Sequence, residues 1–393
     1  MLITLAVENY RSLRHLIVAL GRLNVVTGAN GTGKSSLYRA LRLLADSARN
    51  GAIAALAREG GLPSALWAGP ETVGRAVREG IHPVQGTVRT KPISLRLGFA
   101  AEDFGYAIDL GQPPHNEASA FSLDPEIKRE CTWAGPVLRP ATLLCDRGAN
   151  SVRIRDASGD WYAAPNAIRP YDSMLSEYAD PQRAPDLLAL RERVRSWRFY
   201  DHLRTDADAP ARSNRVGTRT PVLSHDGADL AAALQTIREI GDGDALDGAV
   251  DAAFPGSRVD IAAHAGRFEV RLRQHGMLRP LGVAELSDGT LRYLLWVAAL
   301  LTPRPPELLV LNEPETSLHP DLLRPLAGLV HAASTVTQIV AVTHSRTLVS
   351  ALEQAAGREG TQLRTIELVK EFGQSTVVGQ GRLDEPPWHW PSR

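Results

Sequence analysis

A glycine-rich segment near the N-terminus carries the residue types and the spacing that bind phosphate. Residues Gly28-Ala29-Asn30-Gly31-Thr32-Gly33-Lys34-Ser35 fit the pattern GxxxxGK(S/T) at every position. Glycines let such a loop turn successive backbone N–H groups toward anionic oxygens, and a helix that follows adds the positive end of its dipole. We therefore expect a nucleotide to bind here. The residues expected to contact it are Gly28, Asn30, Gly31, Thr32, Gly33, Lys34, Ser35 and Ser36.

Two residues of this loop have separate chemical roles. Lys34 supplies a mobile positive charge to the β- and γ-phosphates, and the Ser35 hydroxyl is suited to ligate Mg²⁺. The chain has four lysines against 40 arginines, so a lysine inside this loop is hard to attribute to chance. The alternative is a glycine turn that happens to end in Lys-Ser. A strand expected before the loop and a helix expected after it favour the phosphate site.

An apolar strand that ends in a carboxylate is the second candidate for chemistry. Leu308–Leu311 is entirely apolar and leads to Asn312 and Glu313. Just past the strand end, Glu313 is placed to accept a proton from a water that attacks the γ-phosphate. The alternative is an ordinary exposed Glu-Pro turn. Because the same chain contains the phosphate loop, we favour the catalytic interpretation.

A serine–glycine turn and a histidine complete the set. Ser287 and Gly289 open an amphipathic helix, and such a turn at a helix N-terminus is a second anion site. Ser287 could instead serve only as the N-cap of that helix. The segment Thr343-His344-Ser345 directly follows an apolar strand at 338–342, so His344 lies just past a strand end. Taken alone, it would equally fit a satisfied surface histidine, but its order after the other motifs favours the site.

Alternating strands and helices must position these residues. Strands are expected at 2–7, 16–20, 23–27, 308–311 and 338–342, helices at 37–48, 288–301 and 322–333, and hairpins within 87–110 and 258–273. This alternation indicates an α/β fold with a largely parallel sheet. Between 111 and 255 proline, glycine and turn residues recur, and short helices are expected at 184–202 and 228–240. No heptad pattern is sustained there, which excludes a long coiled-coil arm.

Composition narrows the class of protein. The formal net charge is zero and hydrophobic residues make up 44%, as in a soluble globular protein. The apolar run Leu294–Leu301 is too short to span a bilayer, so we expect no membrane partner. Cys131 and Cys145 form no metal-binding or disulfide pattern. The first residues lack the features of a signal peptide, and we expect a cytoplasmic protein.

Taken together, the motifs resemble the RecF/SMC/OLD-type branch of ABC ATPases, an AAA family ATPase group labelled AAA_21-like. The segments that carry the resemblance are Leu5–Leu13, Gly28–Ser35, Asp226–Ala231, Glu285–Arg292 and Leu308–Pro320. The resemblance implies an ABC-type P-loop NTPase head with a mixed β-sheet and an inserted, mainly helical lobe. Residues 1–110 and 256–393 would form the two halves of the head, and 111–255 the lobe.

The same resemblance implies ATP and Mg²⁺ as cofactors and a homodimer whose two heads enclose ATP. Ser287 and Gly289 would grip the γ-phosphate held by the other copy, His344 would act as the switch histidine, and Ser317 and Leu318 would lie in the D-loop. A role in DNA repair or phage defence would follow, with a repair or effector protein as partner.

Two departures from the family pattern bear on catalysis. The Walker B strand normally ends in an aspartate in the second shell of Mg²⁺, where this chain has Asn312. An amide keeps a hydrogen bond but loses the charge. Asp288 replaces the usual glycine of the signature, and a carboxylate beside a phosphate is electrostatically unfavourable. We therefore expect slow hydrolysis. Gln85 is a candidate for the Q-loop, although a lone glutamine before a glycine also fits a turn.

An arginine-rich stretch raises the question of DNA. Residues 183–219 hold nine arginines against five acidic residues, with Trp197, Phe199 and Tyr200 among them. Phosphate contacts and base stacking would suit DNA. The alternative is buried aromatics and a solvated arginine face, and the excess of arginine along the whole chain favours this alternative. A regulatory ATP switch that recruits an effector, turns over little and does not touch DNA is the rival to the ATPase hypothesis. A membrane-transport subunit is a third class, which the large insert disfavours.

Overall fold

The computed structural model describes all residues except 50, 71–92, 115–119, 122, 149–150, 157, 165–166, 202, 382 and 393. The chain forms two compact units, and each is assembled from segments that are distant in the sequence. Unit 1 comprises Met1–Gly21, Thr27–Trp197 and Ile366–Arg393, and unit 2 comprises Arg22–Val26 and Arg198–Thr365. Among the helices in these described residues, none combines the length and hydropathy needed to cross a membrane.

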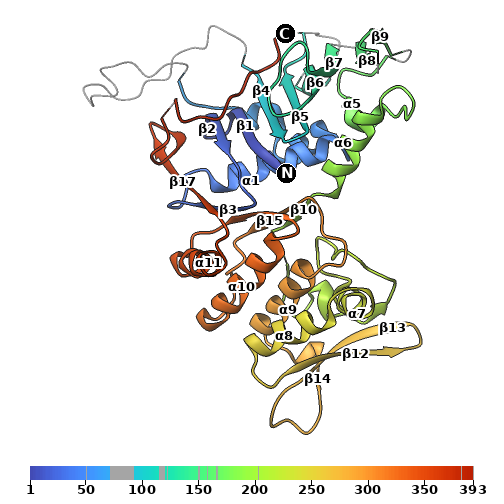
Figure 1. The fold of residues 1–393 in the computed structure, drawn as a ribbon, viewed down its shortest axis with the longest axis vertical. Coiled ribbons are helices and arrows are strands. Elements are labelled where there is room, and N and C mark those ends of the chain that lie inside the picture. The colour runs from blue at the N-terminus through green and yellow to red at the C-terminus, as the bar shows by residue number, and fades with distance from the viewer. Residues whose placement is uncertain are drawn as a thin grey trace. The chain divides into compact units, whose positions relative to one another are not determined.

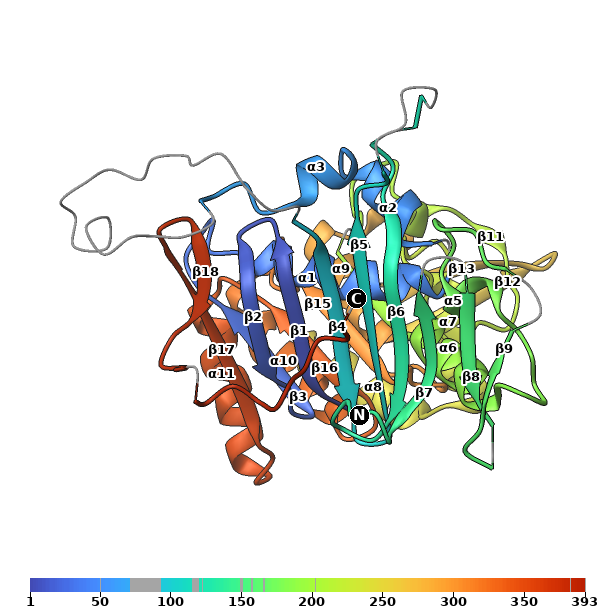
Figure 2. The same cartoon turned by 90° about the horizontal axis from the view of Figure 1, so that it is seen from above.

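Unit 1 is built on an antiparallel sheet of eight strands, which Figure 2 shows side by side. Their order is β2 (Leu13–Ala19), β1 (Leu2–Tyr10), β4 (Leu95–Ala101), β5 (Phe104–Gly111), β6 (Glu126–Ala134), β7 (Leu143–Gly148), β8 (Ser151–Arg155) and β9 (Trp161–Ala163). The expected hairpin within 87–110 is seen as β4 and β5, which pair Phe99 with Tyr106. Residues 87–92 of that expectation lie outside the described part of the chain.

The helices of unit 1 follow the phosphate loop and the last strands of this sheet. They are α1 (Lys34–Ser47), α2 (Ala52–Arg58), α3 (Gly61–Ala65), α5 (Met174–Glu177) and α6 (Pro185–Ser196). Leu37, Leu41 and Leu44 recur at the spacing that puts them on one face of α1, and all three are fully buried. A hairpin of β17 (Leu363–Glu371) and β18 (Gln374–Val377) follows near the C-terminal end.

A buried ion pair connects β6 to β7 in unit 1. Arg147 Nη1 lies 3.0 Å from Glu130 Oε2, and neither side chain is exposed. The Glu130 carboxylate also accepts hydrogen bonds from the Tyr106 hydroxyl at 2.7 Å and from the Met174 backbone N–H at 2.8 Å. Burial, and then the adjacent Glu130, raise the pKa of Tyr106 well above its ordinary value. Such a pair is stable only while each charge keeps its partners.

Unit 2 contains a parallel sheet in the order β10 (Arg198–Tyr200), β15 (Leu308–Asn312), β16 (Gln338–Val342) and β3 (Leu23–Thr27). The middle strands are continuous apolar runs, as expected where both faces of a parallel sheet are covered. The strands expected at 23–27 and 338–342 match β3 and β16 to the residue.

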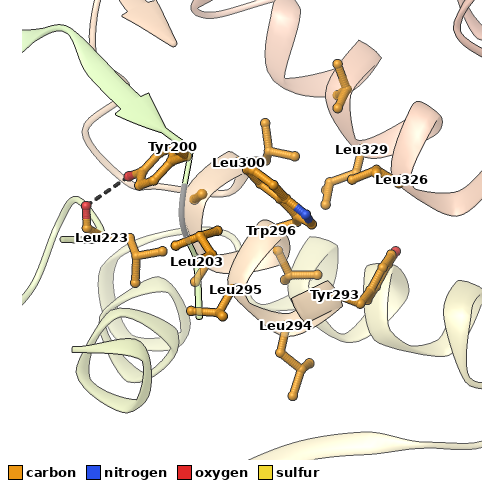
Figure 3. Close-up of a cluster of buried hydrophobic side chains, with 14 of the residues drawn as sticks. Tyr200, Leu203, Leu223, Tyr293, Leu294, Leu295, Trp296, Leu300, Leu326 and Leu329 are labelled. Atoms are coloured by element: carbon orange, nitrogen blue, oxygen red, sulfur yellow. Dashed lines mark hydrogen bonds between the residues drawn. The ribbon is translucent and has the colours of Figure 1, made fainter. Parts of the chain in front are cut away.

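The helices of unit 2 enclose one large apolar core, part of which Figure 3 shows. They are α7 (Leu230–Ile240), α8 (Gly243–Ala253), α9 (Asp288–Leu300), α10 (Leu323–Ser334) and α11 (Arg346–Arg358). Trp296 of α9 is 1% exposed and packs edge-on against Tyr200 of β10. A small antiparallel sheet flanks the helices and contains β11 (Arg215–Val216), β12 (Arg258–His264), β13 (Arg267–Arg273) and β14 (Leu281–Gly282). Figure 1 shows this sheet next to α7 and α8.

Two details of the fold differ from the sequence expectations. The strands β10, β15, β16 and β3 of unit 2 pair in parallel, as expected. The eight strands of unit 1 pair antiparallel, because most of them are joined by short turns. The helix expected over 184–202 ends at Ser196, since Trp197 takes an extended conformation and Phe199 then pairs with Val310 of β15. Residues 111–255 contain strands β6–β9 as well as helices and are shared between the two units, 111–197 in unit 1 and 198–255 in unit 2.

Candidate nucleotide-binding site

The phosphate loop in unit 1 has a backbone that only glycine adopts readily. Gly28 and Gly33 have φ values of 143° and 106°, in the region that side chains disfavour. A Cβ at Gly28 would lie 2.3 Å from the Leu368 carbonyl oxygen, and one at Gly33 would lie 2.3 Å from Ser375 Oγ. Glycine is thus needed at Gly28 and Gly33 for the turn, and also because Leu368 and Ser375 of the same chain lie close to the loop.

Helix α1 begins directly after this loop with its first turn uncapped by any side chain. Its N-cap is Gly33, and no acidic residue occupies the first turn. The backbone N–H groups at a helix start have no partner within the helix and carry the positive end of its dipole. An anion is the natural partner for such a helix start when a glycine loop precedes it.

Lys34 is folded back over the loop. Its ammonium donates hydrogen bonds to the carbonyl oxygens of Gly28 at 2.7 Å and Ala29 at 2.9 Å, and the residue is 7% exposed. Thr32 Oγ1 donates to the Ala29 carbonyl at 2.8 Å, so this hydroxyl stabilises the loop itself. The loop therefore holds its positive charge in place through its own carbonyl groups.

The other residues expected at this loop differ in accessibility. Asn30, Gly31 and Ser35 are exposed, whereas Gly28 and Ser36 are half-buried. The exposed Ser35 hydroxyl at the start of α1 fits the role of a Mg²⁺ ligand, because hard cations take neutral and anionic oxygen ligands. Gln85, the candidate for the Q-loop, lies outside the described residues.

Two serines next to the loop, Ser12 and Ser375, were not identified as site residues from the sequence. Ser375 Oγ donates to Ser12 Oγ at 2.8 Å, and the Ser375 N–H donates to the Ser12 carbonyl at 2.8 Å. A Cβ at Gly33 would lie 3.0 Å from Ser12 Oγ. The hydroxyls of Ser12 and Ser375 therefore both lie close to the end of the loop. Ser12 lies within the N-terminal segment that carried the family resemblance. No sequence signal distinguished Ser375.

In unit 2 the carboxyl ends of three parallel strands lie at one edge of the sheet. Asn312 pairs with Val342, and Val342 pairs with Val26. Glu313 follows Asn312, and His344 follows Val342 by two positions. Ligands of open α/β sheets bind beyond this edge. The sheet topology therefore places Glu313 and His344 at the same edge of the sheet of unit 2.

Glu313 and His344 lie near one another in unit 2. His344 Nδ1 is 3.6 Å from Glu313 Oε1, and the two side chains are 52% and 46% exposed. Glu313 has a left-handed φ of 48°, and its N–H donates to the Val342 carbonyl at 2.7 Å. Non-glycine residues held in this region often lie at functional sites. The structure thus pairs the two side chains that the sequence nominated for catalysis.

Glu315 is a third member of this cluster that the sequence did not reveal. Its carboxylate is 7% exposed and lies 3.3 Å from His344 Nδ1. The same carboxylate accepts from Thr343 Oγ1 at 2.5 Å and from the His344 backbone N–H at 3.2 Å. A buried carboxylate bound to the backbone and ring of His344 holds that residue in place. Glu315 lies in a polar stretch of the sequence, where side chains are expected to be exposed. Its burial therefore could not be predicted from the sequence.

Asn312 ends β15 and is half-buried. Its amide carries no charge, in contrast to the aspartate usual at this position of the family. A neutral amide here offers a divalent cation only the dipole of its oxygen and not the full negative charge of a carboxylate.

The serine–glycine turn opens α9 in unit 2. Ser287 is the N-cap, and its hydroxyl accepts from the Thr290 N–H at 3.2 Å. Ser287 and Asp288 are exposed, and a Cβ at Gly289 would lie 3.2 Å from the Ser317 carbonyl oxygen. The capping role and an anion-binding role are compatible, because the cap satisfies only one of the free N–H groups.

The arginine-rich stretch does not present its aromatics for stacking on bases. Trp197, Phe199 and Tyr200 are each at most 1% exposed. Trp197 packs against Phe99, and the Tyr200 hydroxyl donates to the Leu223 carbonyl at 2.8 Å. The burial of these rings matches the alternative that the sequence favoured, in which the aromatics belong to the core, and it argues against base stacking. The C-terminal Trp388 likewise packs within unit 1, edge-on against Trp133.

Comparisons with solved structures show the fold. An SMC head bound to the C-winged helix domain of ScpA matches 96% of this chain and 96% of that chain with a TM-score of 0.51 at 12% identity. The SMC head domain from Thermotoga maritima matches 96% and 98% with a TM-score of 0.43 at 14% identity. No curated protein matches the chain at a significant level. The expected ABC-type head fold with mixed sheet is thus confirmed by the first of these structures.

A family model matches most of the sequence. It spans residues 23–350 and is described as "AAA domain, putative AbiEii toxin, Type IV TA system". The matched region includes the phosphate loop, the serine–glycine turn, Glu313 and His344. The chain is a member of this AAA_21 family of ABC-type P-loop ATPases.

Proposed function

We propose that this chain is an ATP-binding, slowly hydrolysing ATPase that dimerises around ATP and acts in DNA repair or phage defence. The observation that carries the proposal is the uncapped start of α1 behind a glycine loop that holds Lys34 in place. Family membership supports the use of ATP and Mg²⁺. The family description names a putative AbiEii toxin, which supports the defence role.

In this proposal the two faces of each ATP are bound by different copies. The backbone of Gly28–Gly33, together with Lys34, holds the phosphates in one copy. Ser287 and Gly289 of the second copy bind the γ-phosphate at the start of α9. The N-termini of α1 and α9 would bind phosphate in the same way, through free backbone N–H groups and the positive end of the helix dipole.

The residues after β15 and β16 would carry the hydrolytic step. Glu313 accepts a proton from the attacking water, and His344 hydrogen-bonds the γ-phosphate. Ser35 and Asn312 are the residues that would face Mg²⁺, which when bound neutralises charge on the phosphates. The accessible hydroxyl of Ser35 fits this cation, whereas the neutral Asn312 fits it poorly, so we expect slow turnover.

A second function is a regulatory ATP switch that dimerises, recruits an effector protein and hardly hydrolyses ATP. Asn312 favours it, and so does the burial of the aromatics in the arginine-rich stretch, which removes one argument for direct DNA contact. A solved SMC head of similar fold is bound to a partner protein, the C-winged helix domain of ScpA. That complex supports a protein partner for this chain as well.

The decisive experiment measures dimerisation and turnover in the same samples. Sedimentation analysis with and without ATP tests the dimer, and phosphate release with and without single- or double-stranded DNA tests the enzyme. ATP-dependent dimerisation with slow, DNA-stimulated turnover would support the first function. Dimerisation with negligible turnover that DNA does not alter would favour the switch. A chain that binds ATP but stays monomeric would contradict both.

A defence role is tested separately in cells. Expression of the wild-type chain in a bacterial host, followed by plaque counts with a panel of phages, should show protection. Lys34→Ala is the matched variant, because it removes the charge at the phosphate loop. Equal plaque counts with both proteins across the panel would contradict a defence role, and survival after DNA damage would then test the repair role.

A further inference from the structure

Arg212 in unit 2 is bound from several sides by a different part of the same unit. It ends the short 3-10 helix Pro210–Arg212, and its side chain is 10% exposed. Nη1 donates to the carbonyl oxygens of Val283 at 2.8 Å and Leu286 at 3.0 Å. Nε donates to the Thr205 carbonyl at 2.9 Å. A guanidinium with this many acceptors is fixed in position, because its planar fork presents all its N–H groups at once.

Two acceptors of Arg212, Val283 and Leu286, lie in the stretch that leads into the serine–glycine turn. Leu286 precedes Ser287, the N-cap of α9, and Val283 begins the short 3-10 helix that ends at Glu285. The carbonyl oxygens of Val283 and Leu286 therefore point at one side chain. Arg212 links this stretch to the loop that contains Thr205, so the entry into α9 has an anchor outside its own helix.

Arg212 also neutralises the one charge that is unfavourable for the turn. Its Nη2 lies 2.8 Å from Asp288 Oδ1, and the Asp288 side chain is 61% exposed. Asp288 stands between Ser287 and Gly289, the two residues proposed to bind a phosphate. An unpaired carboxylate there would repel the phosphate, whereas a carboxylate bound to a guanidinium contributes little net charge.

Arg292 also interacts electrostatically with this carboxylate. Arg292 lies one helical turn along α9, and its pKa is lowered by burial, while Asp288 opposes that shift. The bonds to Val283 and Leu286 come from Arg212.

We propose that Arg212 is a positioning residue for the ATP-dependent dimer, which holds the Ser287–Gly289 turn in shape and neutralises Asp288. The proposal rests on the proposed function of that turn. It accounts for two features that the sequence left without explanation, the acidic residue in the signature and one arginine of the arginine-rich stretch.

Four variants test it in the full-length chain. Arg212→Gln removes the charge at similar size, and Arg212→Lys keeps the charge without the fork. Asp288→Asn removes the repulsion, and the double variant Arg212→Gln/Asp288→Asn combines the two changes. Arg204→Gln is the matched control, since Arg204 belongs to the same stretch but pairs with the exposed Asp206.

The readouts separate ATP binding by one copy from dimerisation. Binding of a fluorescent ATP analogue to dilute protein should stay within about twofold of wild type in every variant, because the phosphate loop is untouched. Dimerisation with a non-hydrolysable analogue should weaken by at least about tenfold in Arg212→Gln and less in Arg212→Lys. Asp288→Asn in the Arg212→Gln background should recover about threefold or more.

Wild-type dimerisation by Arg212→Gln would overturn the proposal, and so would a weakened dimer that Asp288→Asn does not improve at all. Hydrogen exchange of the Thr290 and Leu291 amides in the nucleotide-free protein gives an independent readout. Both amides are bonded to Ser287, so exchange should rise in Arg212→Gln and stay unchanged in Arg204→Gln. If the wild-type chain does not dimerise, the proposed function fails. Hydrogen exchange of the Thr290 and Leu291 amides then tests whether Arg212 positions the turn. Unchanged exchange in Arg212→Gln would overturn this positioning role.

Discussion

Glu315 offers a quantitative test of how unit 2 holds its candidate catalytic side chains. Its 7% exposed carboxylate accepts from the Thr343 hydroxyl and from the His344 backbone N–H. Glu315→Ala removes the oxygen that accepts both hydrogen bonds, Oε1, and leaves both donors unpaired. Hydrogen bonds to a charged group contribute about 1.5–3 kcal/mol each, so the two sum to about 3–6 kcal/mol. Water that enters beside the half-exposed His344 recovers part of this, and we expect unfolding to become easier by about 2–4 kcal/mol.

Glu315→Gln separates the structural part from the chemical part. Its amide oxygen can accept both hydrogen bonds, so the loss of stability should stay below about 1.5 kcal/mol. The charge that faces His344 Nδ1 is lost, however, and the ring is held less firmly. We expect the turnover number to fall by about tenfold with little change in KM, since a misplaced catalytic group affects the chemical step more than ATP binding.

Urea denaturation followed by circular dichroism measures the first effect, and steady-state phosphate release measures the second. Glu353→Ala is the control, because Glu353 is exposed on α11 and its loss should change stability by no more than about 0.5 kcal/mol. If Glu315→Ala unfolds within about 1 kcal/mol of the wild type, the carboxylate does not hold the His344 turn and the reasoning fails.

Four further predictions follow from the site and the fold. Lys34→Ala should weaken ATP binding by about 100-fold or more, since it removes the charge held over the loop; equilibrium binding that changes by less would contradict this. Asn312→Asp should raise turnover by about tenfold if the missing charge limits hydrolysis, and an unchanged rate of phosphate release would assign slow turnover to another cause. Glu130→Ala leaves the guanidinium of Arg147 buried without its partner and should destabilise unit 1 by about 3–5 kcal/mol, measured by thermal unfolding against an exposed glutamate variant. Burial raises the pKa of the Cys145 thiol to about 12, so the folded chain should resist alkylation at pH 8 and the unfolded chain should not.

The pKa of Cys145 also gives stability a direction with pH. The thiol titrates near its ordinary pKa in the unfolded chain but at a higher pKa in the folded one. Below the ordinary pKa both states keep the proton, and stability is unaffected. As the pH rises from about 8.5 to 12 only the unfolded state loses it, so this thiol lowers stability by about 1.4 kcal/mol per pH unit. A Cys145→Ser variant should show a shallower decline over that range in urea denaturation.

The short local motifs could be predicted from the sequence because each depends on residues that are close along the chain. The glycines of the phosphate loop are required by their own backbone angles, and β3 and β16 are short apolar runs bounded by turns. The N-cap at Ser287 follows from local capping preferences. These features needed no knowledge of the rest of the fold.

Features that depend on distant partners could not be predicted in this way. The helix expected over 184–202 stops at Ser196 because β15, more than 100 positions later, provides a strand for Phe199 to pair with. The sequence left open whether the aromatics of the arginine-rich stretch are buried, and the packing of Trp197 on Phe99 and of Tyr200 on Trp296 shows that they belong to the core.

The sequence by itself determined that the chain binds a nucleotide, since phosphate binding needs only a local loop and a helix start. Tertiary structure decided which side chains support that chemistry. Glu315 reaches His344, Ser375 reaches Gly33, and Arg212 reaches Asp288, and each pair joins segments far apart in the chain. Spacing in a sequence carries no information on such contacts, because burial and hydrogen bonding arise only when the folded chain brings these segments together.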